Sequence, residues 1–298
     1  MNRWIEAARP RTLPLALANI LLGNFLAFSK GNFSFITGIL TILTTLFLQI
    51  LSNFANDYGD SKKGTDNLDR KVAMRTVQTG KISLNEMKKG IYFLMAISFL
   101  TGIGLIYFSL KQASLNEILL FLLLGIFAIL SSIGYTMGKK PYGYLGLGDL
   151  FVFLFFGLIG TMGSYYLQTL DFNYWILMPA SSVGFLSIAV LNLNNLRDIE
   201  NDKKNGKISM VVRMGFNKGI VYQKILILFG CLGFLIYNLF FNNLYSYLLL
   251  ALGILPLLKL FFEINNKMKP EELDPYLKKT ALSTLWMVIV FGISQFIQ

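Results

Sequence analysis

The sequence predicts an all-α, polytopic membrane protein whose nine helices cross the bilayer. Of its 298 residues, 54% are hydrophobic and only 14% are charged, whereas a soluble domain carries about 25% charged residues. Apolar segments long enough to span a bilayer, about 20 residues, recur along the whole chain. These segments are expected at 13–28, 33–55, 90–109, 115–136, 145–168, 174–196, 220–240, 244–262 and 280–297.

The segments differ mainly at their ends. The first is short and contains Pro14, so its N-terminal boundary is the least defined. The second, FSFITGILTILTTLFLQILS, runs directly into the polar stretch NFANDYGDSKKGTDNLDR. Nine spans are too many and too long for a signal peptide, and no stretch has the composition of a separate soluble domain. We therefore expect one membrane domain over residues 1–298, in two halves of roughly 1–140 and 141–298.

Basic residues indicate how the helices are oriented. The chain has 27 Lys and Arg and a formal net charge of +11. Most of them lie in alternate loops, at 1–12, 56–89, 137–144, 197–219 and 263–279. The opposite loops hold only Lys30 and Lys111. By the positive-inside rule we expect a cytoplasmic N-terminus, an inner (cytoplasmic) membrane location and large loops facing the cytoplasm. The charge then meets anionic lipid headgroups, and nucleic acid is not an expected partner.

Missing residue types narrow the chemistry. The chain contains no histidine, which excludes histidine metal ligands and histidine general bases. Its one cysteine, Cys231, falls inside an apolar segment, so disulfide and thiol chemistry are not expected to be central. Carboxylates, amides, Lys, Arg and Tyr remain as the groups that can carry a reaction.

One polar pattern occurs twice, about half the chain apart. Its spacing of 0, +3, +7 and +11 is followed by Asn53, Asn56, Asp60 and Gly64, and again by Asn195, Asp198, Asp202 and Gly206. Positions three, four and seven apart share a helix face, so each copy presents a row of oxygen ligands, with Asp57 adding one to the first. Polar caps at helix ends are the alternative interpretation, but negative charge at a helix C-terminus opposes the helix dipole.

The chemistry of these two rows favours Mg²⁺ and a diphosphate. Oxygen ligands suit Mg²⁺, which typically bridges one or two carboxylates to substrate phosphates. Basic side chains that could neutralise the remaining phosphate charge stand nearby. They are Lys62, Lys63, Arg70, Lys71 and Arg75 in the first loop, and Arg197, Lys203, Lys204 and Lys207 in the second. At a membrane interface, such a site predicts a lipid diphosphate whose tail runs between the helices.

Several stretches together resemble the UbiA superfamily of intramembrane aromatic prenyltransferases. They are ARPRTLPLALANILLGN, NDYGDSKKGTD, YTMGKKPYGYLGLGDLFVFLFFG and NNLRDIENDKKNGK. The pattern is similar to the branch that prenylates 1,4-dihydroxy-2-naphthoate in menaquinone biosynthesis. The 4-hydroxybenzoate branch usually has a third aspartate four residues after the position of Asp60, where Gly64 stands here, with Asp66 two residues further on.

The resemblance implies helices around a central cavity, a Mg²⁺ cofactor, and transfer of a polyprenyl group from its diphosphate to the naphthoate, with decarboxylation to demethylmenaquinone. The implied metal ligands are Asn53, Asp57, Asp60, Asn195, Asp198 and Asp202. The expected catalytic residues are Asp57, Asp60, Asp198, Asp202 and Tyr135. Expected substrate contacts are Arg9, Arg11, Asn56, Lys63, Asp66, Arg75, Arg197 and Lys207.

Some of these assignments have plainer alternatives. Tyr135 could stabilise an allylic cation with its ring or could be an interfacial tyrosine. Arg9 and Arg11 could bind the acceptor carboxylate or could be ordinary cytoplasmic anchors. Asp149 could be functional or could complement a helix dipole.

Two alternative functions remain open at the level of sequence. A family relative acting on another acceptor, such as 4-hydroxybenzoate, would share the acidic motifs. A secondary transporter would explain the repeat, but it would need a site reachable from both sides, and the middles of the apolar segments carry almost no ionisable residue. The acceptor pocket, the length of the prenyl chain and the oligomeric state do not follow from the pattern.

Overall fold

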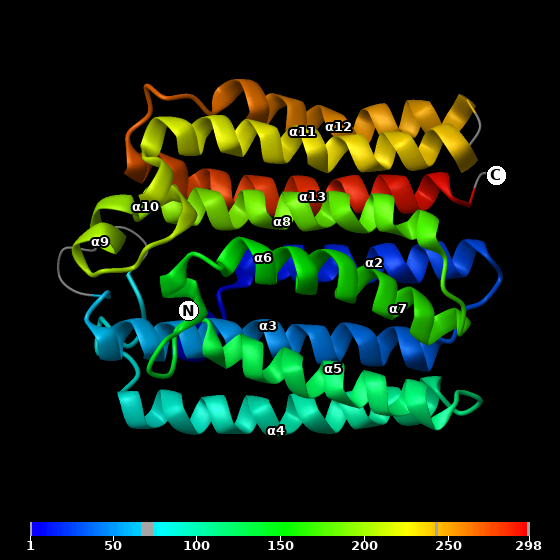
Figure 1. Ribbon diagram of the computed structural model, residues 1–298, viewed down its shortest axis with the longest axis horizontal. Helices are drawn as coiled ribbons and strands as arrows, with labels where there is room; N and C mark the ends of the chain where they lie inside the picture. The colour runs from blue at the N-terminus through cyan, green and yellow to red at the C-terminus, as the bar shows by residue number, and fades with distance from the viewer. Residues whose placement is uncertain (1, 67–73, 242–243, 297–298) are drawn as a thin grey trace.

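The protein, described here by a computed structural model, is a bundle of long helices that run roughly parallel to one another (Figure 1). The structure describes residues 2–66, 74–241 and 244–296. The helices and short turns are α1 (Arg3–Ala8), η1 (Pro10–Thr12), α2 (Leu13–Ser29), α3 (Phe35–Lys63), α4 (Leu84–Ser109), α5 (Leu115–Gly134), η2 (Tyr142–Leu145), α6 (Gly148–Val152), η3 (Phe153–Ile159), α7 (Gly160–Thr169), η4 (Tyr174–Ile176), α8 (Leu177–Arg197), α9 (Ile199–Lys204), α10 (Met210–Met214), α11 (Phe216–Phe241), α12 (Leu244–Glu263), η5 (Pro270–Leu273) and α13 (Asp274–Ser294).

Within these described residues, nine helices are long and apolar enough to span a membrane, which confirms the predicted all-α, nine-span fold. The first span joins α1 to α2, and the fifth joins α6, η3 and α7. Pro14 lies in the first turn of α2, a position where proline costs no helical hydrogen bond. The direction in which the chain crosses the membrane stays a prediction.

The chain order and the contacts place α2 near the middle of the bundle. It packs against α3, α7, α8 and α13. On one side of α2, helix α3 packs against α4 and α5. On the other side, α8 packs against α11 and α13, and α13 contacts α12. The short helices α9 and α10 lie at the same end of the bundle as the N-terminus (Figure 1). The polar loops of the predicted cytoplasmic set therefore gather at one end.

The second span is longer than the apolar pattern predicts. Helix α3 was expected to end near residue 55, but it continues to Lys63 and ends at Gly64, which has the left-handed φ of 77° that favours glycine. Asp57, Gly59 and Asp60 of its last turns are buried, and the helix itself pairs their backbone groups. As a result the first acidic motif is held on a rigid helix.

The fifth span contains a π-helical segment, η3, between two α-helical parts. It packs closely on α8, because a Cβ on Gly157 would lie 2.8 Å from the Cα of Gly184. A Cβ on Gly160 would likewise meet the amide of Asn19 at 2.8 Å. π-helical bulges often occur at functional sites, and η3 contributes Phe155 and Phe156 to the wall of the cavity described below.

Candidate active site

The two acidic motifs meet at the end of the bundle that carries α9 and the loop after α3. Their four central carboxylates are buried, with exposed fractions of 1% for Asp57, 5% for Asp60, 7% for Asp198 and 1% for Asp202. The loops are tied together, because Asn201 Nδ2 of α9 donates a hydrogen bond of 2.7 Å to the Thr65 carbonyl. Residues 142 apart in the repeat thus form one polar region.

Lys207 lies among the carboxylates of this region. Its Nζ is 3.1 Å from Oδ2 and 3.3 Å from Oδ1 of Asp202, and it also interacts electrostatically with Asp60, Asp198 and Tyr135. Burial alone would lower the pKa of Lys207, but these negative neighbours outweigh it and raise the pKa. Burial raises the pKa of Asp202 to about 6, although Lys207 acts against this shift. The lysine is therefore one of the buried cations that balance the acidic cluster.

Asp57 and Asp60 each have a partner that the motif does not show. Asp57 Oδ2 accepts hydrogen bonds from the backbone N–H (3.1 Å) and the hydroxyl (2.5 Å) of Thr76. Asp60 Oδ1 accepts a 2.8 Å hydrogen bond from the Tyr144 hydroxyl. Asp57 therefore holds the loop that carries Arg75, which is buried beside it, and Asp60 joins α3 to η2.

The second motif is bound into a network of charges. Arg197 contacts both oxygens of Asp198 at 2.7 Å through Nε and a terminal nitrogen. Its other terminal nitrogen donates to Asp274 Oδ1 at 2.6 Å, and Arg11 donates to the same carboxylate at 3.0 Å and 3.2 Å. Asp274, the first residue of α13, thus links the N-terminal turn to the end of α8. Asp274 lies outside both acidic motifs, so the sequence does not indicate this role.

Two of the predicted asparagines hydrogen-bond to other parts of the protein, and the third has a side-chain oxygen without a partner among the described residues. Asn53 donates to the Ala8 carbonyl at 2.9 Å and to the Thr12 hydroxyl at 3.1 Å, so it fixes the N-terminal turn onto α3. Asn56 accepts from Thr136 at 3.2 Å. Asn195 is buried, and its Oδ1 has no hydrogen-bond partner in the described part of the chain, so this oxygen is available to a ligand.

The remaining predicted residues lie at different distances from the cluster. Asp66 and Arg75 are buried and lie within electrostatic range of Asp60. Lys63 is exposed, and its Nζ lies 5.4 Å from the centre of the Tyr144 ring. Asp69, Arg70 and Lys71 lie outside the described residues.

Asp149 is outside the motifs and is engaged elsewhere in the bundle. Its Oδ2 accepts a 2.9 Å hydrogen bond from the Tyr222 hydroxyl of α11. This contact joins the fifth span to the seventh. Asp149 also interacts electrostatically with Tyr135, so Asp149 lies at the edge of the candidate site.

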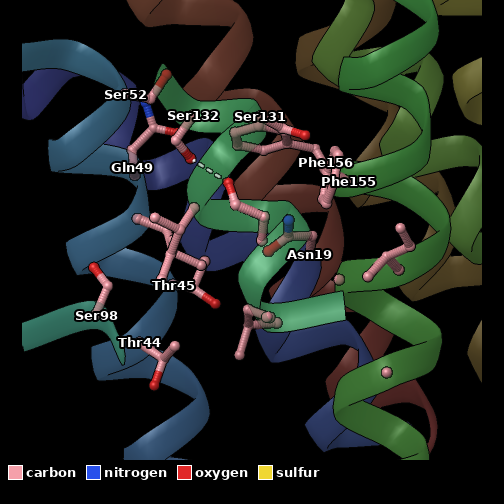
Figure 2. Close-up of a pocket in the computed structure, with 18 of the residues that line it drawn as sticks. Asn19, Thr44, Thr45, Gln49, Ser52, Ser98, Ser131, Ser132, Phe155 and Phe156 are labelled. Carbon is pink, nitrogen blue, oxygen red and sulfur yellow. Dashed lines mark hydrogen bonds between the residues drawn. The ribbon is translucent and has the colours of Figure 1, made fainter. Parts of the chain in front are cut away.

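A cavity of about 360 Å³ opens directly beside the charged cluster. It lies between α2, α3, α4, α5, the η3–α7 segment and α8, and its polar end includes Asn53, Asn56 and Asn194. Arg9 is the one charged side chain among the described residues that line it. Figure 2 shows Thr44, Thr45, Gln49 and Ser52 of α3 on one side of the cavity and Asn19, Phe155 and Phe156 on the other.

An aromatic column forms part of the cavity wall, and sequence reasoning found only its first member. Tyr135 meets Tyr142 edge to face at 5.4 Å, Tyr142 stacks on Phe151 at 4.1 Å, and Phe151 is followed by Phe155 at 6.4 Å. All four line the cavity. The sequence YGYLGLGDLFVFLFF shows that aromatic residues cluster here, but only the folding of η2 and η3 brings them onto one face.

Glycines allow Tyr135 to sit where it does. A Cβ on Gly143 would lie 2.8 Å from the Tyr135 ring, and one on Gly148 would lie 3.1 Å from it. Burial raises the pKa of Tyr135 to about 12, so its phenol is neutral. Tyr135 both faces the charged cluster and lines the cavity.

Comparison with known proteins shows the family of the chain. Residues 16–282 match the UbiA prenyltransferase family. The chain is 42% identical to a 1,4-dihydroxy-2-naphthoate octaprenyltransferase of Haemophilus influenzae, over 98% of this chain and 95% of that protein. It is 39% identical to the protein of the same name from Escherichia coli, over 99% and 95% of the two chains.

Solved structures share the fold at low sequence identity. A UbiA homologue from Aeropyrum pernix superposes with a TM-score of 0.67 at 15% identity, over 96% of this chain and 97% of that one. A homologue from Archaeoglobus fulgidus, bound to GPP and Mg²⁺, gives 0.65 at 18% identity, over 99% and 100%. With the family match covering most of the sequence, the chain belongs to the UbiA prenyltransferase family of membrane enzymes.

Proposed function

We propose that this protein transfers a polyprenyl group from polyprenyl diphosphate to 1,4-dihydroxy-2-naphthoate, a step of menaquinone biosynthesis. One observation carries the proposal: Tyr135 belongs both to the buried charged cluster and to the wall of an apolar cavity. A diphosphate bound in the cluster would therefore place the first carbons of its lipid tail inside the cavity. The similarity to naphthoate octaprenyltransferases over nearly the whole chain supports this acceptor.

The residues present fit a Mg²⁺ ion as cofactor. The described residues bring no three carboxylates together as a metal cluster, but Mg²⁺ is commonly held by one or two carboxylates together with substrate phosphates. The buried oxygens of Asp60, Asp202 and Asn195 meet that requirement, and Asn195 Oδ1 has no partner within the described residues. Bound there, Mg²⁺ would neutralise the negative charge that develops on a departing diphosphate.

The protein's own cations have a defined part in this reaction. Lys207 and Arg75 are buried beside the acidic residues, where positive charge acts strongly because water is scarce. They would hold the diphosphate as the bond between its oxygen and the allylic carbon breaks, with the electron pair leaving on oxygen. The faces of Tyr135 and Tyr142 would stabilise the allylic cation.

Arg9 would orient the acceptor. It has a left-handed backbone conformation, φ 51°, at the turn between α1 and η1, and its side chain reaches the cavity wall. An arginine suits a carboxylate, because its guanidinium matches two oxygens at once. Arg11, two residues later, instead pairs with Asp274. Of the two arginines, Arg9 is the one that lines the cavity, which supports Arg9 as the contact for the acceptor carboxylate.

The atoms of the proposed reaction balance. A ring carbon forms the new bond to the allylic carbon, and the displaced ring proton is lost. The carboxylate leaves as CO₂, its electron pair stays on the ring, and that carbon takes up a proton. The products are diphosphate, CO₂ and demethylmenaquinone in its reduced form.

The test is transfer by the purified protein in detergent. It receives radiolabelled polyprenyl diphosphate, Mg²⁺ and either dihydroxynaphthoate or 4-hydroxybenzoate, with EDTA in a parallel sample. We expect labelled lipid and CO₂ only from the naphthoate with Mg²⁺. Product from 4-hydroxybenzoate alone would keep the reaction class and overturn the acceptor, and no product from either would overturn the proposal.

A further inference from the structure

A group of polar side chains lies inside the cavity, away from the charged cluster. We call Asn19 of α2, Thr44 of α3, Ser98 of α4 and Ser131 of α5 the polar belt. All four line the cavity, and Figure 2 labels each of them around it. They come from four different helices, so a single amphipathic helix face does not account for them.

Each member of the polar belt has a polar atom without a partner. In the described part of the chain, Asn19 Oδ1, Thr44 Oγ1, Ser98 Oγ and Ser131 Oγ are buried and accept or donate no hydrogen bond. The exposed fractions are 2% for Asn19, 2% for Ser98 and 6% for Ser131. Buried polar atoms are paired in the large majority of cases. Four exceptions around one cavity indicate a ligand that carries its own polar groups.

The depth of the belt suits a ring held below the diphosphate. The hydrogen bond between Asn53 and Thr12 places these two residues at the same level, at the polar end of the cavity. Asn19 follows Thr12 by seven residues of helix, and Thr44 precedes Asn53 by nine. At 1.5 Å per residue Asn19 and Thr44 lie roughly 10–14 Å deeper. Ser131 lies nearer the polar end, because Thr136, five residues later, donates a hydrogen bond to Asn56.

The belt is chemically different from the upper end of the cavity. Its members are neutral amide and hydroxyl groups, which donate and accept hydrogen bonds, whereas the charged residue among the described lining side chains is Arg9. A carboxylate is therefore better held by Arg9, and a phenolic hydroxyl is better held by the belt. A polyprenyl tail has no polar group for either and fits the wall that includes Phe155 and Phe156.

We infer that the polar belt is the acceptor-specificity site and that its members Thr44 and Ser98, on the neighbouring helices α3 and α4, bind the 4-hydroxyl of the acceptor ring. This inference rests on the proposed function. With the carboxylate at Arg9, the 1-hydroxyl beside it stays near the cavity's upper end and the 4-hydroxyl points toward the belt. The belt then distinguishes a 1,4-dihydroxy acceptor from a monohydroxy one.

The experiment removes hydroxyls without changing side-chain shape much. The double variant Ser98→Ala, Thr44→Val is compared with wild type and with Ser182→Ala. Ser182 is a matched control, because its hydroxyl is also buried and unpartnered among the described residues but does not line the cavity. For each protein, with Mg²⁺ present, KM is measured for dihydroxynaphthoate and for polyprenyl diphosphate. The inhibition constant of 1-hydroxy-2-naphthoate, which lacks the 4-hydroxyl, is measured in the same assay.

We expect the double variant to raise KM for dihydroxynaphthoate about three- to tenfold, the range for losing a neutral hydrogen bond. Its KM for polyprenyl diphosphate and its inhibition constant for 1-hydroxy-2-naphthoate should stay at wild-type values, as should all values for Ser182→Ala. The inference is overturned if the acceptor KM is unchanged, if the monohydroxy inhibitor weakens equally, or if KM for the prenyl donor rises instead. A wild-type protein that prenylates no naphthoate would overturn the proposed function, and with it the ligand assigned to the belt.

Discussion

Replacing Lys207 with methionine tests whether this lysine balances the charge of the acidic cluster. The substitution keeps a long unbranched side chain but removes the ammonium that lies 3.1 Å and 3.3 Å from the Asp202 oxygens. The exposed side-chain fractions are only 6% for Lys207 and 2% for Asp202, so water cannot replace the lost charge. We expect a less stable protein that depends more strongly on Mg²⁺.

The size of the effect follows from the burial of the pair. Removing one partner of a buried ion pair typically costs about 3–5 kcal/mol. Asp202 can recover part of this by taking up a proton, since the pKa of Asp202 already lies at about 6. At pH 7.5 we therefore expect a loss of about 2–4 kcal/mol, which corresponds to a midpoint of thermal unfolding lower by roughly 3–6 °C for a chain of this size.

The assay is thermal unfolding of detergent-solubilised protein with and without Mg²⁺. Lys203→Met is the matched control, because it removes the same charge from an exposed position on α9. Binding of Mg²⁺ to the folded state should raise the midpoint of Lys207→Met more than that of the control. Equal midpoints for the two variants, or an equal response to Mg²⁺, would refute the assigned role of Lys207.

The remaining predictions concern protonation and the charge network. Because burial raises the pKa of Asp202 to about 6, its carboxyl is protonated as the pH falls through that value and can no longer bind a cation. Prenyl transfer should therefore decline below about pH 6, and higher Mg²⁺ should move this decline to lower pH; a midpoint independent of Mg²⁺ would contradict the assignment. Asp274→Asn removes a charged partner of Arg197 at 2.6 Å and of Arg11 at 3.0 Å. Since Asp274 is 26% exposed, we expect a loss near the lower end of the range for charge-assisted hydrogen bonds, about 1–2 kcal/mol, measured as a lower unfolding midpoint, together with a higher KM for polyprenyl diphosphate. Asp274→Glu should restore both the unfolding midpoint and the KM. If Asp274 contributes only to stability, Asp274→Asn will leave the KM for polyprenyl diphosphate unchanged.

Local features of the sequence were sufficient for the architecture. Nine spans were placed from apolar runs, and the part of the chain that the structure describes confirms each of them with shifts at the ends. The shift at the end of α3 arose because a polar helical face that packs on protein looks the same in sequence as a polar loop. Only the neighbours of Asp57 and Asp60 distinguish these two cases.

The candidate site was found in part. The two acidic motifs, Lys207 and Tyr135 were predicted and lie together in the structure. Thr76, Tyr144 and Asp274 were not predicted, although each contacts a predicted residue directly. Such partners carry no spacing rule of their own.

Sequence alone therefore determined the membrane class, the nine spans, the paired motifs and the family resemblance, because hydropathy, charge and motif spacing are properties of short stretches. Tertiary structure decided which group each charged side chain contacts and where the cavity lies. The reason is the length of chain between the partners: Tyr144 is 84 residues from Asp60, Asp274 is 77 from Arg197, and Arg11 is 263 from Asp274. Contacts over such separations depend on how the helices pack, and that packing also brings the four members of the polar belt around one cavity.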